Sequence, residues 1–499
     1  MKMYLIWQIG LSVLSGVLLG LAFPPWNVSW LVWIAFVPVL GGLLILRGSA
    51  LVLLVQGTLF SATFGLIAFN WLGAETRWNE LAQNVGTLVV AGAVWAWLVG
   101  RFAVLPEFPR AKSGKKKSLE PILVSPGRST EAWIGSGAHL RLAALVASAW
   151  TALEWARGFL LPVWNQAGLP VGGNLALLQL TKVVGPTGLT FVVVFANTII
   201  LANIRRFILQ PGRMNWAGRF DVTATLAVLL LVAAAGFWSI RSAPEPKGLK
   251  VCTVSSSETD LNRLTDLSLV APATHCDLVV WRRTQLHSGD YQVLTKASLG
   301  QSITLIAGTA VSPEAPVTGY NVFTPGSVRS VFAFASHPLF QLMADRRLRN
   351  DQPISSKDAA ILPLLENDAA SLETFRAAVQ KQIQCFVVLI DQPVAVATEE
   401  EQLKQNVRVW AVALGRPLVF NSRRAGAILL ARSGRVTGSI DPQIEGATVG
   451  EIDPPVGVDS SSYAIYGDWF PITVGVLALF LALSEGLKKF YAEPRRFHP

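Results

Sequence analysis

Residues 4–23, YLIWQIGLSVLSGVLLGLAF, form a stretch of twenty positions without a charged side chain. A helix of about 20 apolar residues is long enough to span the hydrocarbon core of a bilayer. No small-residue cleavage site follows this stretch and another apolar run begins at once, so we expect a retained helix. Seven further spans are expected, at about 30–46, 50–70, 86–104, 140–161, 188–204, 222–240 and 469–487. The sequence therefore predicts a polytopic α-helical membrane domain of about eight helices.

The composition agrees with a membrane protein. Hydrophobic residues make up 52% of the 499 positions, only 15% are charged, and the mean hydropathy is +0.44, whereas a soluble chain carries about 25% charged residues. The formal charge of +10 comes from basic residues beside apolar runs, so we interpret it as a topology signal and expect no nucleic acid. The three cysteines have no metal-site or disulfide spacing. We expect no cofactor and no metal.

Basic residues predict the orientation in the membrane. If the helices alternate, the lysines and arginines at the N-terminus, in 106–139, in 205–219 and at the C-terminus all fall on one side. That side is expected to be the cytoplasm of a bacterium. Both termini would then be cytoplasmic in the inner membrane, and residues 241–468 would be periplasmic. Segment 106–139 is expected to be a basic cytoplasmic loop.

From residue 250 the sequence changes to short β-rich runs. We expect strands at 249–254, 276–281, 302–307, 385–390, 417–421 and 427–431, with helices at 371–381 and 399–415. Strands that alternate with helices predict a layered α/β domain. The chain thus divides into a seven-helix membrane domain (1–240), an outer domain (241–468), and a final helix with a basic tail (469–499). Residues 163–187 are expected to be a loop that dips at the membrane surface.

Several segments resemble one known family. They are LAFPPW (21–26), AWTALEWARG (149–158), GPTGLTF (185–191), DLVVW (277–281), YN (320–321), GRP (415–417), SGRV (433–436) and YAIYGDW (463–469). In this order they are similar to the apolipoprotein N-acyltransferase family. The resemblance implies eight membrane helices and a nitrilase-like domain, an α-β-β-α sandwich, before the last of them. It also implies transfer of an acyl chain from a phospholipid to the N-terminal diacylglyceryl-cysteine of a lipoprotein.

The resemblance further implies a Cys nucleophile, a Glu base and a Lys that stabilises the tetrahedral intermediate. Cys385 is assigned to the nucleophile position, Arg283 to the Glu position, and Ala335 to the Lys position. An arginine offers no acceptor for a proton. Two family glutamates are also replaced, by Val387 and Ala413.

The altered positions leave two interpretations of the function. One is a pseudoenzyme retained as a binding or structural subunit of a membrane assembly. The other is an active N-acyltransferase that forms a thioester at Cys385. In either case the expected partners are phospholipid or lipoprotein acyl chains in a cleft between the membrane and the outer domain, with other membrane-complex subunits in the first case.

Individual side chains have competing interpretations too. A lone Cys385 in an apolar run is more often a buried, inert thiol than a nucleophile. We expect Arg282 and Arg283 to face solvent or lipid headgroups, and His337 to pack locally rather than act as a base. Glu154 and Arg157 fit a pair that holds helices together as well as they fit substrate contact.

Overall fold

The structure is a computed structural model of the 499-residue chain. It describes residues 2–46, 48–74, 76–105, 126–161, 165–209, 219–242, 248–256, 260–270, 276–284, 286–309, 317–334, 353–357, 359–390, 396–455 and 460–492. Ala335 and His337 lie outside these residues, and so does most of the basic loop 106–139.

The membrane part is a helix bundle. Within the described ranges, seven stretches are long and apolar enough to cross a bilayer. They are α1 (Lys2–Leu21), the stretch Ser29–Leu46, α3 (Ala50–Ala68), α5 (Trp78–Phe102), α9 (Thr187–Leu209), α10 (Phe220–Ser242) and α17 (Trp469–Ala492). The stretch Ser29–Leu46 combines η1 (Ser29–Trp33), α2 (Val37–Gly41) and η2 (Gly42–Leu46). Many side chains of α10 and α17 remain exposed, as expected of helices that face lipid.

The span expected at 140–161 is part of α6 (Pro126–Arg157). This helix carries Arg141, Glu154 and Arg157, which explains why it is less apolar than the seven. It packs against α9 and α17 and its side chains between Leu142 and Trp150 are largely buried. The described part of the bundle therefore contains eight long helical segments, and α6 buries Glu154 and Arg157.

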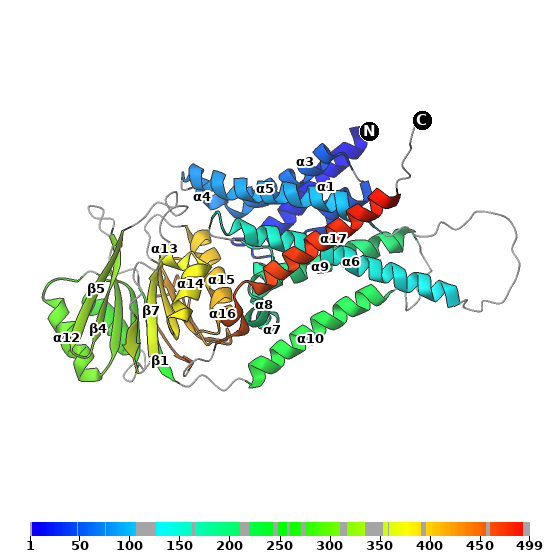
Figure 1. Ribbon diagram of the computed structural model, residues 1–499. Helices are drawn as coiled ribbons and strands as arrows, with labels where there is room; N and C mark the ends of the chain where they lie inside the picture. Colours follow the sequence, from blue (N-terminus) through cyan, green and yellow to red (C-terminus); the bar gives the residue numbers. More distant parts are fainter. Residues whose placement is uncertain are drawn as a thin grey trace, which may run out of the picture.

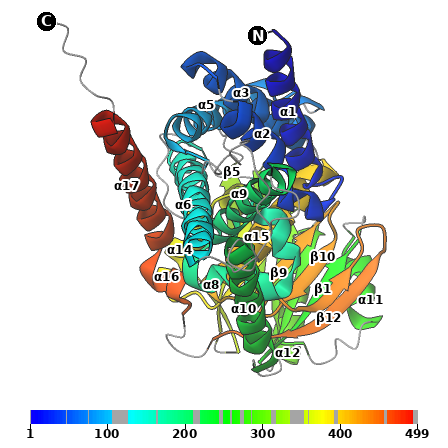
Figure 2. The ribbon, with the colours of Figure 1, turned by 90° about the vertical axis from the view of Figure 1, so that its right-hand side faces the viewer.

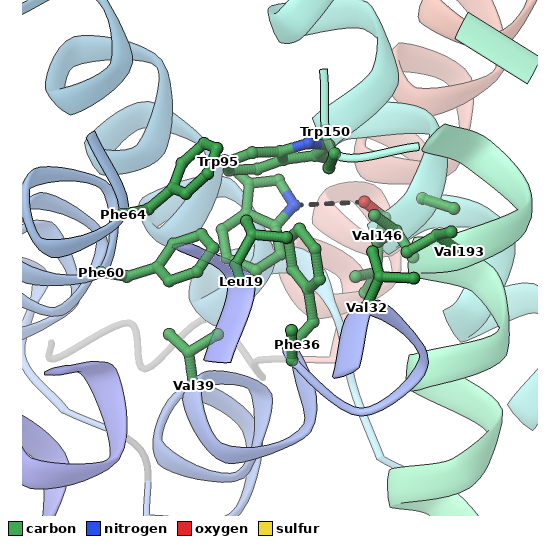
Figure 3. Packing of buried hydrophobic residues seen from close by; sticks show 14 of the residues in the cluster. Leu19, Val32, Phe36, Val39, Phe60, Phe64, Trp95, Val146, Trp150 and Val193 are labelled. Carbon is green, nitrogen blue, oxygen red and sulfur yellow. Dashed lines mark hydrogen bonds between the residues drawn. The ribbon is translucent and has the colours of Figure 1, made fainter. Parts of the chain in front are cut away.

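Aromatic rings fill the centre of the bundle (Figure 3). The ring of Trp150 lies 5.2 Å from that of Phe36 and 5.1 Å from that of Trp95, both edge to face. Trp95 Nε1 donates a hydrogen bond to the carbonyl of Val146 at 3.2 Å. Edge-to-face packing of this kind adds to the energy gained by burial, and here it joins the residue before α2 to α5 and α6.

The outer domain consists of two six-stranded sheets. The first has the order β12-β1-β2-β3-β4-β5, with bounds Gly446–Ile452, Leu249–Ser255, Leu278–Thr284, Thr304–Thr309, Val317–Thr324 and Ser327–Phe334. The second has the order β11-β10-β9-β8-β7-β6, with bounds Val436–Ile440, Ala427–Leu430, Leu418–Ser422, Cys385–Ile390, Ala359–Leu365 and Ile354–Ser356. Strands β1, β2 and β3 are parallel to one another, as are β7, β8 and β9.

Helices cover the outer face of each sheet (Figure 1). The first sheet packs against α11 (Leu261–Val270) and α12 (Asp290–Gln301), and the second against α14 (Leu372–Gln380) and α15 (Ala397–Leu414). A third apolar cluster lies between the sheets and includes Val251, Val280, Val387 and Val419. The predicted α-β-β-α sandwich is confirmed.

Short helices connect the outer domain to the bundle (Figure 2). The region expected to be a loop at 163–187 contains η3 (Leu169–Gly173), α7 (Leu175–Leu178) and α8 (Thr181–Val184), and all three contact α15. On the chain's return to the membrane, α16 (Ser462–Tyr466) precedes α17, and Trp469 Nε1 donates to the carbonyl of Val183 at 3.0 Å. Helix α15 therefore lies between the second sheet and the bundle.

Candidate functional site

The carboxyl ends of β1, β2 and β9 meet at one edge of the sandwich. Arg282, near the end of β2, donates from Nη1 to the carbonyl of Ser422 at 3.2 Å and from Nη2 to the carbonyl of Ser256 at 2.5 Å. Ligands in α/β proteins bind beyond the carboxyl ends of parallel strands. This edge is therefore where reacting groups are expected to converge.

Arg282 is buried at this edge, so the expectation that it faces solvent or headgroups is wrong. Arg282 is only 5% exposed. Two strands that are distant in the sequence end around its guanidinium, which neutralises their carbonyl dipoles and joins the two sheets. A buried arginine in this arrangement stays protonated and cannot act as a base.

A carboxylate and an amide complete the polar edge. Glu400, at the start of α15, accepts hydrogen bonds from the backbone amides of Arg424 at 2.5 Å and Ala425 at 3.2 Å. Burial raises the pKa of Glu400, and these backbone hydrogen bonds oppose that rise. Asn421 donates to Thr253 Oγ1 and to the carbonyl of Val254, both at 2.8 Å. In the described part of the chain, Glu400 Oε1 and Asn421 Oδ1 have no hydrogen-bond partner.

Cys385 lies at the other end of the strands. It is the first residue of β8, is fully buried, and packs in the apolar layer between the sheets. Its Sγ lies 3.6 Å from the carbonyl oxygen of Phe386. Burial, and secondarily the charge of Asp453, raises the pKa of the thiol well above its usual range. Attack requires the thiolate, so this environment favours an inert thiol.

The pairing of β8 with β9 shows how far Cys385 lies from the polar edge. Ile390, the last residue of β8, pairs with Ser422, whose carbonyl accepts from Arg282. Ile390 lies five positions after Cys385, which is about 17 Å along a strand. The structure therefore does not bring Cys385 together with Arg282.

The other two cysteines also lie away from the edge. Cys252 is in the middle of β1, and Cys276 precedes β2 by two residues. Both are buried on the face that α11 and α12 cover. These three are the only cysteines of the chain, so no thiol stands at the carboxyl ends of β1, β2 and β9.

The structure describes some of the remaining predicted site residues fully and others only in part or not at all. Arg283 is in β2, but only its backbone is described, and Ala335 lies outside the described residues. Val387 packs between the sheets and Ala413 is buried in α15. Within the bundle, Glu154 accepts from the amide of Ala167 at 2.8 Å and from Thr190 Oγ1 at 2.7 Å. Glu154 of α6 therefore contacts α9 and the segment before η3.

Sequence reasoning missed a polar junction between α15 and the bundle. Gln402 Oε1 accepts from Trp71 Nε1 and from Asn165 Nδ2, both at 3.1 Å, while its Nε2 donates to the carbonyls of Pro24 at 3.3 Å and Ala68 at 2.8 Å. Next to it, Arg77 bridges Glu80 and Glu399. Acidic residues in the first turn of a helix usually face solvent. Here Glu399, Glu400 and Gln402 are buried.

Comparison with known proteins finds a family that the membrane part resembles. Residues 15–199 match the family model described as the apolipoprotein N-acyltransferase N-terminal domain. Over these residues the chain is similar to apolipoprotein N-acyltransferases. An apolipoprotein N-acyltransferase of Geobacter metallireducens is 27% identical over 240 residues, which is 46% of this chain and 39% of that protein. The alignment therefore spans well under half of this apolipoprotein N-acyltransferase relative.

Solved structures resemble the chain more distantly. An amidase from Nesterenkonia sp. is 14% identical, covers 46% of this chain and 98% of its own, and gives a TM-score of 0.31. A carbon–nitrogen hydrolase from Helicobacter pylori G27 is 13% identical, covers 50% of this chain and 95% of its own, with a TM-score of 0.32.

Proposed function

We propose that this chain is a pseudoenzyme of the apolipoprotein N-acyltransferase family, a membrane scaffold that retains a binding role without acyl transfer. The observation that carries the proposal is the position of the thiols. All three cysteines are buried and none stands where the strands' carboxyl ends meet. A nucleophile must lie beside the group that accepts its proton, and here the two kinds of group are separated by the length of a strand.

The geometry also supports a different alignment of the nucleophile position. In the family motif Ile-Cys-Tyr-Glu, the Glu follows the Cys by two residues. Glu366 directly follows β7, whose carboxyl end lies at the same edge as those of β8 and β9. This alignment places Leu364, which is 1% exposed, at the Cys position. A leucine has no nucleophilic atom, so the realignment strengthens the proposal.

The base position supports the same conclusion. The strand that should be followed by a glutamate ends in Trp281-Arg282-Arg283-Thr284. A general base contributes about 10²–10⁴ in rate, and a group that stabilises the oxyanion about 10²–10³. Loss of both, together with the nucleophile, would leave turnover near background.

The binding role fits the arrangement of the two parts. Figure 1 shows that α1 begins and α17 ends at the end of the bundle remote from the outer domain. With the basic segments cytoplasmic, this arrangement supports a periplasmic outer domain in an inner-membrane protein. We propose that phospholipid or lipoprotein acyl chains contact the junction beneath α15, alone or with other membrane subunits.

Purification from native membranes tests the binding role. Native mass spectrometry of the full chain is expected to detect a bound phospholipid, a lipoprotein or a partner subunit that survives exchange into fresh detergent. A single-span membrane protein from the same preparation controls for lipid carried over by detergent. If the chain emerges with none of the three, the scaffold proposal is contradicted.

A further inference from the structure

One guanidinium holds two carboxylates at the junction of the outer domain and the bundle. Arg77 lies between α4 (Asn70–Ala74) and α5. Its Nε and Nη2 donate to the two oxygens of Glu80, at 2.9 Å and 2.5 Å, and its Nη1 donates to both oxygens of Glu399, at 3.0 Å and 3.2 Å. Glu80 belongs to α5 and Glu399 to α15. The contact therefore joins the two parts of the molecule.

The charges at this contact do not balance. The side chains of Glu80 and Glu399 are 10% and 6% exposed, and that of Arg77 is 28% exposed. One positive charge thus faces two negative charges in a place with little water. Two carboxylates that share one cation cannot both stay ionised easily, because each disfavours the charge of the other.

Among the residues that the structure describes, neighbouring charged groups do not correct the imbalance. Glu400 follows Glu399 on α15, with Arg282 of β2 and the amide of Arg424 around its carboxylate. Those groups offset the charge of Glu400 itself. Glu401 pairs with Lys404 at 2.7 Å on the more exposed side of α15. From the bundle, the indole of Trp71 packs against Arg77, with 5.5 Å between the guanidinium carbon and the ring centre.

We propose that Arg77, Glu80 and Glu399 form a proton-binding site that couples docking of the outer domain on the bundle to pH. The shared proton resides on Glu399 and cancels the excess negative charge of the docked junction. When the junction opens, water solvates both carboxylates and the proton is released. This proposal is independent of whether the chain transfers acyl groups.

The pKa values agree with this geometry. Burial raises the pKa of Glu399 to about 7, against the attraction of Arg77, and Glu80 and Glu400 raise it further. Burial alone would lower the pKa of Arg77, but its hydrogen bond with Glu80 and the charge of Glu399 raise it, so the guanidinium stays charged. The carboxylate, and not the arginine, is the group that titrates.

The sign of the pH effect follows from these shifts. Exposed to water, Glu399 has its ordinary pKa of 4.5, and docking raises it to about 7. Protonation of Glu399 therefore contributes fully to docking below pH 4.5. This contribution is lost as the pH rises through about 7. Over that interval the docking equilibrium is expected to weaken by roughly two to three orders of magnitude, at tenfold per pKa unit.

Infrared difference spectroscopy on the full chain in nanodiscs tests the site directly. The wild type is expected to show a protonated-carboxyl band that disappears as pH rises, with a midpoint near 7. Glu399→Gln should remove the band. Glu80→Gln should move its midpoint to lower pH, because Arg77 then serves one carboxylate. Glu401→Gln, on the same helical turn, should leave the band unchanged.

Hydrogen–deuterium exchange supplies the docking readout. Amide exchange at the start of α15, taken relative to its intrinsic rate at each pH, should increase with pH in the wild type and in Glu401→Gln. It should stay low and independent of pH in Glu399→Gln, because glutamine imitates the protonated acid. A wild type without a titrating band between about pH 5 and 8, or a band that persists in both Glu399→Gln and Glu80→Gln, would overturn the proposal.

Discussion

Replacing Gln402 with leucine is expected to lower the free energy of unfolding by about 3–5 kcal/mol, since a buried group left without its hydrogen bond costs roughly 1–3 kcal/mol. The side chain of Gln402 makes four hydrogen bonds to the membrane part. Leucine has nearly the same size but can make none of them. Two donors and two carbonyls, from the three segments around Pro24, Ala68 and Asn165, would remain buried without that partner.

Gln405→Leu is the matched control for this change. Gln405 lies one turn further along α15 and donates to Asn27 Oδ1 at 3.0 Å in an exposed position. Water replaces that bond, so a loss below about 1 kcal/mol is expected for this variant. Thermal unfolding in detergent and limited proteolysis between α10 and β1 would measure both. Equal effects of the two substitutions would show that Gln402 does not hold the domains together.

Gly57→Ala is expected to destabilise the bundle by about 3 kcal/mol or more, which is the upper range for overpacking a filled core. Small residues allow membrane helices to approach closely. A methyl group at Gly57 of α3 would overlap the carbonyl oxygen of Gly92 on α5 and lie 2.6 Å from Cβ of Ala96. Backbone cannot rotate away as a side chain can, so the two helices would have to separate.

The opposite result is expected for Gly86→Ala. Gly86 lies within α5, as Gly57 lies within α3. Nothing lies within 4 Å of a methyl group at Gly86. Alanine is favoured over glycine in a helix by about 1 kcal/mol, so this variant should be neutral or more stable. Thermal unfolding monitored by tryptophan fluorescence would compare the two. Similar stabilities for both variants would contradict the close packing of α3 on α5.

The membrane helices could be predicted because each apolar run carries its own signal. Helix α3 runs for 19 residues without a charged side chain, whatever its neighbours are. Helix α6 was expected as well, although Glu154 and Arg157 made its signal weaker. The buried strand β8 was found with the same bounds for the same reason, since CFVVLI is apolar throughout.

Strand β7 was missed, and that omission affected the interpretation of the site. Its sequence, AAILPLL, contains Pro363, and proline within a run argues against a central strand. Without β7, the next apolar strand, β8, seemed to carry the nucleophile motif. A sequence motif does not show whether a residue begins or ends a strand. The strand register is what places Cys385 far from Arg282.

The junction could not be predicted from local patterns. Gln402 binds groups that are 237 to 378 residues earlier in the chain, and nothing near it in the sequence indicates burial. The three glutamates Glu399, Glu400 and Glu401 resemble the solvated first turn of a helix. Glu399 is buried against Arg77 of the bundle and Glu400 against backbone amides of the outer domain, while Glu401 stays partly exposed.

A search for an acyl-enzyme tests the absence of a reactive nucleophile most directly. The purified full chain would be incubated with a phospholipid that carries isotopically labelled acyl chains, beside an active apolipoprotein N-acyltransferase as the positive control. Peptide mass spectrometry would then examine Cys252, Cys276 and Cys385. We predict no thioester on any of the three. A labelled thioester on Cys385 that is absent from Cys385→Ser would contradict the account.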